Sequence, residues 1–280
     1  MPHARVALLT ILALAAFAGN SLLCRAALTR TSIDAASFTT VRLLSGALTL
    51  WLLVALRRRD AAGKGNWLSA LALFAYAAGF SFAYLQLPAA SGALILFGAV
   101  QATMIAWGLR SGERLRPVQL TGLVLACAGV VGLLLPGLSA PPLASSLLML
   151  GAGMAWGVYS LRGKGAGDAL QVTSGNFLRA VPIALALSAL LWRDASPDPM
   201  GIWYAVLSGA LTSGLGYAIW YTALPHIAAT SAAAVQLSVP VLAALGGVAF
   251  LAEPLSLRLL AASTAIIGGI ALVVLAPRKA

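Results

Sequence analysis

The chain has 280 residues, of which 61% are hydrophobic and only 9% are charged, and its formal net charge at pH 7 is +11. A soluble domain is typically about 25% charged, so this composition excludes a soluble globule and indicates an integral membrane protein. The positive charge then reflects cationic loops that orient helices and contact anionic lipid, rather than a nucleic-acid partner. Two cysteines and two histidines supply neither a disulfide framework nor a cluster of metal ligands. We therefore expect no metal site and no cofactor.

Apolar segments long enough to cross a hydrocarbon core about 30 Å thick recur along the whole chain. We predict ten transmembrane helices, at residues 5–24, 35–56, 66–87, 89–109, 116–135, 143–161, 171–191, 201–223, 227–250 and 256–276. The first segment has a basic residue ahead of an apolar run, as a signal peptide does, but it is long for one and has a later counterpart. We expect it to be retained as a helix. The predicted fold class is therefore an all-α integral membrane protein.

The basic residues are distributed unevenly between the two sides of the predicted bundle. If the N-terminus lies inside the cell, 12 of the 18 Lys and Arg residues fall on the inner side and four on the outer side. Because cytoplasmic loops carry an excess of Lys and Arg, we expect both termini to be cytoplasmic, in the inner membrane of the cell.

The two halves of the chain repeat one another. Residues correspond at offsets of 137 or 140: 84–88 with 221–225, Arg42 with Arg179, and 112–115 with 252–255. We therefore predict two copies of five helices, at residues 1–137 and 138–280. Since five is odd, the second copy crosses the membrane in the opposite sense. Inverted repeats of this kind are typical of secondary transporters, whose substrate sites lie near the midplane between the copies.

The turns after the fourth and ninth spans carry the most specific sequence pattern, Gly112-Glu113-Arg114-Leu115 and Ala252-Glu253-Pro254-Leu255. Together with ten spans in two copies, this pattern resembles the EamA-type members of the drug/metabolite transporter superfamily, and among them bacterial exporters of aromatic and other amino acids. The Trp-Gly pair usual near the start of a copy is present at Trp156-Gly157, whereas the first copy has Ala18-Gly19-Asn20. The resemblance implies a basket of spans 1–4 and 6–9 around a central cavity. Spans 5 and 10 would lie outside it, and spans 3, 4, 8 and 9 would form the gates.

Aromatic residues at helical spacing mark the third and eighth spans, and a few polar side chains lie within otherwise apolar spans. Aromatic rings suit apolar or amphipathic solutes, and hydroxyl and amide groups can orient them. We expect the cavity to be lined by Asn20, Tyr76, Phe80, Phe97, Gln101, Trp156, Tyr159, Ser213, Tyr217, Gln236 and Pro240. Pro240, in the middle of the ninth span, would free a carbonyl and kink the helix. The alternative is ordinary helix packing, or an aromatic belt at the membrane interface for Tyr84, Trp220 and Tyr221.

The two repeated hairpins are candidate gates on opposite sides of the membrane. The turn at Leu87-Pro88 should lie outside and the turn at Leu224-Pro225 inside. We assign gating or hinge roles to Tyr84, Pro88, Tyr221 and Pro225.

Four charged residues are predicted to have structural roles: Arg42, Arg179, Glu113 and Glu253. Burying an arginine in a membrane costs about 2.5–3.5 kcal/mol even on the lenient insertion scale. Arg42 and Arg179 could recognise a carboxylate, or could bond carbonyls of a neighbouring helix or reach toward an interface. We favour the structural role, because both arginines lie on spans, the second and the seventh, that carry none of the side chains expected to line the cavity. We expect Glu113 and Glu253 to neutralise the N-termini of the fifth and tenth spans. With no acidic residue or histidine in mid-span, both uncoupled export and proton coupling without an obvious carboxylate stay open.

These features favour an exporter of amino acids or similar small amphipathic metabolites that works by alternating access. Its partners would be a small-molecule substrate and the lipid bilayer, with no obligate protein partner. An antiporter of phosphate compounds or nucleotide sugars is the alternative in the same superfamily, but it needs Lys or Arg facing the cavity, and the fourth and ninth spans contain none. A membrane enzyme is less favoured, because no set of catalytic side chains is evident in mid-span.

Overall fold

The computed structural model describes residues 1–57, 65–112, 115–135, 137, 140–163, 167–227, 232 and 235–275. Every regular element in these residues is helical, which confirms the predicted all-α fold class. The helices are α1 (His3–Arg30), α2 (Ala35–Leu56), α3 (Trp67–Tyr84), α4 (Ala89–Arg110), α5 (Pro117–Leu134), α6 (Leu143–Gly163), α7 (Ala169–Leu190), η1 (Trp192–Asp194), α8 (Pro199–Val206), η2 (Leu207–Leu215), α9 (Gly216–Ala223), η3 (Leu224–His226), α11 (Ser238–Leu251) and α12 (Leu257–Leu275).

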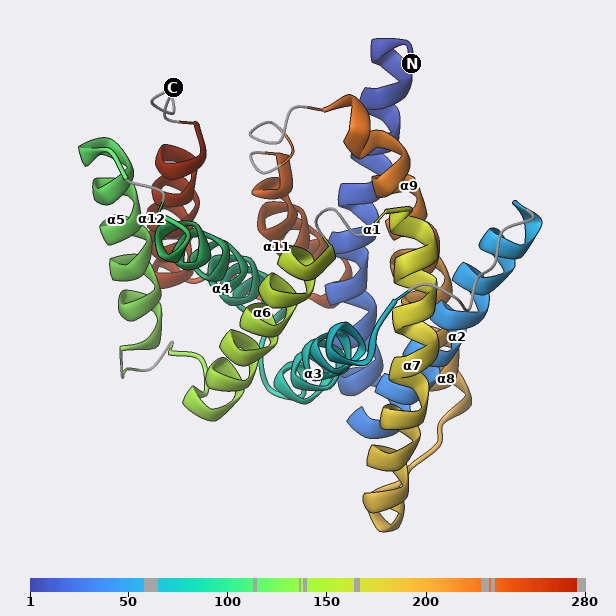
Figure 1. The fold of residues 1–280 in the computed structure, drawn as a ribbon. Helices are drawn as coiled ribbons and strands as arrows, with labels where there is room; N and C mark the ends of the chain where they lie inside the picture. Colours follow the sequence, from blue (N-terminus) through green and yellow to red (C-terminus); the bar gives the residue numbers. More distant parts are fainter. Residues whose placement is uncertain are drawn as a thin grey trace.

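Within the described residues, nine helical stretches are long and apolar enough to cross a membrane, and α11 is a shorter apolar helix. The eighth stretch, Pro199–His226, joins α8, η2, α9 and η3 into one span. The start of α1 and the end of α12 lie at the same end of the bundle (Figure 1). This is the arrangement that an even number of crossings requires.

Pro240 lies just after an interruption in the ninth span. The described helix α11 begins at Ser238, so Pro240 lies in its first turn and is buried. A proline there removes no hydrogen bond from the helix interior, because the first turn has no internal acceptor for its N–H. Residues 235 and 236 are helical and Leu237 forms a turn, so the ninth span is interrupted next to Pro240, and the hinge role of Pro240 stays a prediction.

Acidic and amide side chains begin several helices. Asp34 accepts a hydrogen bond from the N–H of Ser37 at the start of α2, and Asn66 accepts one from the N–H of Ser69 at the start of α3. Asp168 and Asp198 cap α7 and α8 in the same way. Each cap satisfies N–H groups that lack a partner within the helix. Carboxylates at these positions are consistent with a structural use rather than a site in mid-membrane.

Helices α5 and α12 pack against one another at one side of the bundle (Figure 1). Glycines allow the close approach, because a Cβ atom on Gly122 would lie 2.5 Å from the carbonyl oxygen of Gly269 and one on Gly129 would lie 2.8 Å from Ile266. Small residues at such crossings are typical of helix pairs in membranes. The other helices surround the interior, in which α3 and α4 pack on α6, and α1 packs on α9 and α11.

Candidate functional site: a central cavity

A cavity of about 570 Å³ lies among α1, α3, α4, α6, α7, η2 and α9. Ten of the eleven side chains selected from the sequence lie on its wall: Asn20, Tyr76, Phe80, Phe97, Gln101, Trp156, Tyr159, Ser213, Tyr217 and Gln236. The eleventh, Pro240, is not among the described lining residues, because it lies in the first turn of α11. The size of the cavity is that of a site for a small molecule.

The cavity begins at the middle of the bundle and extends toward one end only. It reaches Gly163 and Gly167 where α6 ends and α7 is about to begin, and we call this the Gly167 end. The opposite end carries the turn between α3 and α4, and we call it the Pro88 end. Among the described lining residues of α3 and α4, Phe80 and Leu96 are the closest in sequence to that turn. The cavity is therefore closed at the Pro88 end.

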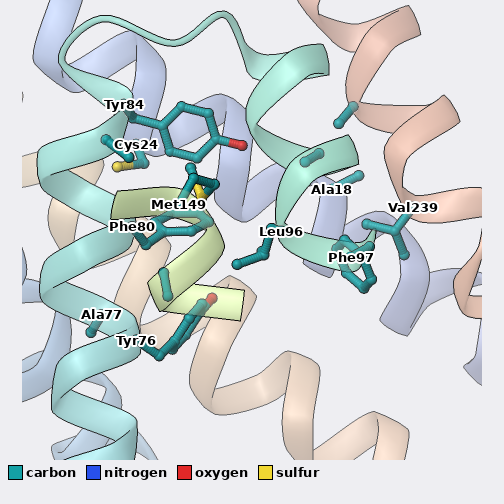
Figure 2. Packing of buried hydrophobic residues seen from close by; sticks show 14 of the residues in the cluster. Ala18, Cys24, Tyr76, Ala77, Phe80, Tyr84, Leu96, Phe97, Met149 and Val239 are labelled. Atoms are coloured by element: carbon teal, nitrogen blue, oxygen red, sulfur yellow. The ribbon is translucent and has the colours of Figure 1, made fainter. Parts of the chain in front are cut away.

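Tightly packed side chains close the Pro88 end. Tyr84, Leu87 and Ala89 are fully buried, and the Tyr84 hydroxyl donates to the carbonyl oxygen of Ala89 at 3.3 Å. Figure 2 shows Tyr76, Phe80 and Tyr84 on one side of α3, with Cys24 beside Tyr84. The aromatic stripe on α3 thus has two parts, in which Tyr76 and Phe80 line the cavity and Tyr84 seals it. Its burial excludes a place for Tyr84 in an interfacial belt.

An ion pair between Arg25 and Glu253 stabilises the closure at the Pro88 end. Arg25 near the end of α1 donates through Nε to Glu253 Oε1 at 3.1 Å, and through Nη1 to the carbonyl oxygens of Tyr84 at 2.9 Å and Leu85 at 3.1 Å. Glu253 Oε2 also accepts from the backbone N–H of Ala89 at 2.8 Å. These contacts join the end of α1, the turn between α3 and α4, and the segment after α11. We call them the Arg25 latch.

The position of Glu253 differs from the prediction that it neutralises the start of the tenth span. Its carboxylate lies at the N-terminus of α4, where the N–H of Ala89 has no partner within the helix. The cause is local, because Ala252 adopts the left-handed conformation (φ 55°) and the chain folds back so that the N–H of Glu253 bonds the carbonyl of Gly247. Glu113 lies outside the described residues.

Aromatic rings form a large part of the cavity wall. Trp156 stacks on Tyr159 and Tyr217, with ring centroids 5.2 and 5.3 Å apart, and its centroid lies 4.8 Å from that of Tyr76. Phe17 packs against Tyr217 and against Trp220, whose side chain is only 6% exposed. Trp220 is therefore a wall residue rather than part of an interfacial belt. A wall of this kind suits the apolar part of an amphipathic solute.

A hydrogen-bonded network lies on one side of the cavity. Asn20 Nδ2 donates to the Tyr76 hydroxyl at 3.3 Å, and Asn20 Oδ1 accepts from the hydroxyl of Ser208 at 2.7 Å. The Thr212 hydroxyl lies 3.4 Å from the same Oδ1 and donates to the carbonyl oxygen of Ser208 at 2.7 Å. Arg42 Nη2 donates to the same Tyr76 hydroxyl at 3.1 Å. The network joins α1, α2, α3 and η2 directly beside the cavity.

The two corresponding arginines are used differently. Arg42 is 2% exposed, and its guanidinium lies against the rings of Tyr76 and Phe80, 5.3 and 4.8 Å from their centroids. Its guanidinium bonds a side-chain hydroxyl and stays buried, in contrast to the predicted bond to a carbonyl of a neighbouring helix. Arg179 Nη1 bonds the carbonyl of Gly175, which is in its own helix, at 2.9 Å. The difference arises because α2 and α3 bring Arg42 behind two rings of the cavity wall.

A π-helical segment, η2, interrupts the eighth span and carries the wall residues Thr212 and Ser213. Gly209 in this segment packs against the backbone of Arg42, which leaves no room for a larger residue. π-helical turns are rare and often occur at functional sites. The sequence signal was the run of Gly, Ser and Thr at 207–216, but it does not by itself distinguish a π-helix from an α-helix.

Sequence reasoning missed part of the wall contributed by α7. Thr173 and Asn176 line the cavity and are each 2% exposed. Their spacing in a helix places them on one face, and two polar residues in an apolar span were the available signal. Of the proposed gate residues, Tyr221 lines the cavity toward the Gly167 end, and Pro225 is exposed beyond it. In the described residues, no three His, Cys, Asp or Glu side chains are placed to hold a metal ion.

A helical bundle of membrane-spanning length around a closed-ended central cavity is the architecture of a membrane transporter. The EamA-like transporter family model matches residues 143–275. The chain is 58% identical over 279 residues to the Pseudomonas aeruginosa protein PA1977, which covers 99% of the chain and 97% of that protein. It is 35% identical over 150 residues to the threonine/homoserine exporter RhtA of Escherichia coli, which covers 50% of the chain and 49% of RhtA. The chain belongs to the EamA-like transporter family.

A crystal structure among the solved structures that match has the same fold. It superimposes with a TM-score of 0.69 over 96% of this chain and 97% of the other, at 19% sequence identity. The protein is thus a multi-pass membrane transporter, as its family and its apolar helices indicate.

Proposed function

We propose that the protein exports neutral amino acids, aromatic ones included, or similar small amphipathic metabolites across the inner membrane. The observation that carries this proposal is the composition of the cavity wall, in which aromatic rings alternate with amide and hydroxyl groups. Among the described lining residues, none is Asp, Glu, Lys, Arg or His. Such a wall suits a solute with an apolar part and a zwitterionic or neutral polar part. The likeness to RhtA, named a threonine/homoserine exporter, supports amino acids as the substrate class.

The proposed mechanism is alternating access between two inverted copies of five helices. Helix pairing supports the two copies, because corresponding spans pack together in the pairs α2 with α7, α4 with α11, and α5 with α12. With the termini in the cytoplasm, as the distribution of basic residues favours, the Gly167 end faces the cytoplasm and the Pro88 end faces outward. The structure would then be the state that accepts substrate from inside the cell.

The alternative, exchange of phosphate compounds, has less support from the cavity. Phosphate recognition relies on Lys and Arg side chains that reach the ligand. The described wall residues contribute no such side chain. The nearest buried cation, Arg42, lies behind Tyr76 and Phe80.

Counterflow in proteoliposomes tests the proposal. Purified protein is reconstituted, the vesicles are loaded with one candidate solute, and uptake of the labelled solute is measured for a panel of neutral amino acids and phosphate compounds at several pH values. We expect neutral amino acids to exchange. If phosphate compounds exchange and neutral amino acids do not, the proposal is contradicted. The pH series shows whether transport is coupled to protons.

A pair of matched variants ties transport to the cavity. Gln101→Ala removes an amide from the wall and should slow exchange about fivefold or more, the value of one hydrogen bond of about 1 kcal/mol. Gln119→Ala makes the same change in α5, where the side chain bonds the carbonyl of Val273 instead of lining the cavity. The exchange rate per reconstituted molecule should be the same for Gln119→Ala as for the unmodified protein. Equal losses in both variants would count against the assigned site.

A further inference from the structure

Arg42 carries a charge that no described side chain neutralises. The one ion pair in the described part of the chain joins Arg25 and Glu253. Arg42 is 2% exposed, its Nη2 bonds Tyr76, and its Nη1 is buried without a hydrogen-bond partner among the described residues. An unpaired N–H on a buried cation is costly, and proteins rarely retain one without a compensating interaction. The guanidinium lies against two rings of the cavity wall, so the missing partner can be an occupant of the cavity.

The Tyr76 hydroxyl connects the Arg42 guanidinium with the cavity, because it bonds Arg42 and its side chain lines the cavity wall. A phenol oxygen accepts two hydrogen bonds and donates one. Both acceptor positions of Tyr76 are used, by Arg42 Nη2 at 3.1 Å and Asn20 Nδ2 at 3.3 Å. Its own proton has no acceptor among the described residues, and the side chain lines the cavity. Tyr76 therefore presents a donor to whatever occupies the cavity.

The network favours this polarity. Asn20 Oδ1 accepts from the hydroxyl of Ser208 at 2.7 Å, and in this arrangement its amide nitrogen faces Tyr76. Toward Arg42 the Tyr76 oxygen can only accept, because a guanidinium has donors only. Ser213, also on the wall, has a buried hydroxyl without a partner and supplies a second possible donor. This side of the cavity combines positive charge with donors that need an acceptor.

We propose that Tyr76 donates a hydrogen bond to the carboxylate of the substrate, and that Arg42 is a positioning residue that orients the hydroxyl and supplies the attracting charge. This inference rests on the proposed function for the place of Tyr76 in a transport cavity, and it deepens that function by making the carboxylate the recognised group. An ammonium group has no acidic side chain to meet among the described wall residues. We therefore expect the cavity to recognise the carboxylate of the substrate, and binding should not require its ammonium group.

Three ligands that share one aromatic ring separate these contributions. L-Phenylalanine carries both charges, 3-phenylpropionate lacks the ammonium, and 2-phenylethylamine lacks the carboxylate. Binding to the full chain in detergent at pH 7 is measured by calorimetric titration. We expect both carboxylates to bind at least tenfold more tightly than the amine.

Variants then test the role of each residue. Tyr76→Phe should weaken the two carboxylates about 10- to 100-fold, the range for a hydrogen bond to a charged group, and leave the amine within about twofold. Arg42→Gln should do the same, and Arg42→Lys should recover part of the loss because the charge is retained. Tyr204→Phe removes a tyrosine hydroxyl in α8, away from the cavity, and should change none of the three. If Arg42→Gln does not fold, Tyr76→Phe still decides the question.

The proposal is overturned if the amine binds as tightly as the acids, if neither acid binds, or if Tyr76→Phe weakens all three ligands alike. The last result would make Tyr76 and Arg42 packing residues only. Counterflow of L-phenylalanine is measured on the same preparations. Carboxylate preference without transport would support this inference and count against the proposed function, whereas transport without carboxylate preference would do the reverse.

Discussion

We predict that the closure of the cavity at the Pro88 end depends on the carboxylate of Glu253 in the Arg25 latch. Replacing Glu253 by Gln preserves the size of the side chain and removes its charge. The carboxylate accepts from Arg25 Nε at 3.1 Å and from the backbone N–H of Ala89 at 2.8 Å. The side chain of Arg25 is 17% exposed and that of Glu253 is 13% exposed. An exposed ion pair contributes about 0–1 kcal/mol, and a buried hydrogen bond to a charged group about 1.5–3 kcal/mol. For these partly buried contacts we take about 1–2 kcal/mol, which corresponds to a change of about 5- to 30-fold in the population with the Pro88 end open.

Cys24 reports this opening without an added label site. It is fully buried beside Tyr84 (Figure 2), and it is not among the described residues that line the cavity, so a reagent that enters from the Gly167 end does not reach it. In a Cys127→Ala background, the rate at which a thiol reagent modifies Cys24 in the purified protein measures transient opening of the Pro88 end. We expect Glu253→Gln to raise that rate about 5- to 30-fold, in line with the population change.

A second carboxylate at the same end provides the control. Asp198 caps α8 by accepting from the N–H of Gly201 at 2.7 Å, and its other carboxylate oxygen accepts from the hydroxyl of Ser32 at 3.3 Å. Asp198→Asn should leave the modification of Cys24 unchanged. An unchanged rate in Glu253→Gln would refute the assignment of the latch, and an equal increase in both variants would indicate general loosening of the fold. In a double-mutant cycle, Arg25→Gln and Glu253→Gln should be less than additive because they share the Arg25–Glu253 contact, although Arg25→Gln also removes the bonds to the carbonyls of Tyr84 and Leu85.

Two further predictions concern stability, measured as the unfolding temperature in detergent. Gly122→Ala should destabilise the protein by about 1–3 kcal/mol, because the new Cβ meets the Gly269 carbonyl oxygen at 2.5 Å, whereas Gly132→Ala in the same helix, with nothing within 4 Å, should be neutral or slightly stabilising. Burial would raise the pKa of Asp34, but hydrogen bonds from the N–H groups of Ser37 and Ser196 outweigh it and hold that pKa below its usual value. This carboxylate therefore contributes stability at neutral pH that is lost as the pH falls below about 4, and Asp34→Asn should show a smaller loss over that range. Equal unfolding temperatures for the two glycine variants, or equal acid sensitivity for Asp34→Asn and the unmodified chain, would contradict these assignments.

The helices could be predicted closely because hydrophobic length determines them. The predicted second span, 35–56, coincides with α2, and the fourth, 89–109, ends one residue short of α4. The shared face of the aromatic side chains on α3 could also be predicted, because a spacing of four residues places side chains on one face of a helix in any surroundings. Such local rules brought Tyr76, Phe80 and Tyr217 to one cavity wall in the prediction and in the structure.

What could not be predicted depends on which helix lies next to which. The sequence gives Arg42 and Arg179 equivalent positions, but only Arg42 lies behind the rings of the cavity wall, because α2 packs beside α3 and η2 at that depth. Glu253 was assigned to the nearest helix along the chain, whereas a left-handed residue directs it to α4. The π-helix of η2 likewise occurs where Gly209 packs closely on α2, a contact that no local sequence pattern indicates.

Arg25 and Arg162 occupy corresponding positions in the two proposed copies, and the proposed alternating access accounts for the difference in their contacts. Arg162, at the end of α6, follows Arg25 at the same offset of 137 that relates Tyr84 to Tyr221. Arg25 holds the carbonyls of Tyr84 and Leu85, whereas Arg162 donates to the hydroxyl of Ser69 and the side chain of Asn66, both at 3.1 Å. The two arginines are thus in different bonding states at opposite ends of the bundle, one fastening a closed end and one beside an open end. Alternating access by inverted copies requires this asymmetry, because equivalent contacts at both ends would close the cavity on both sides at once.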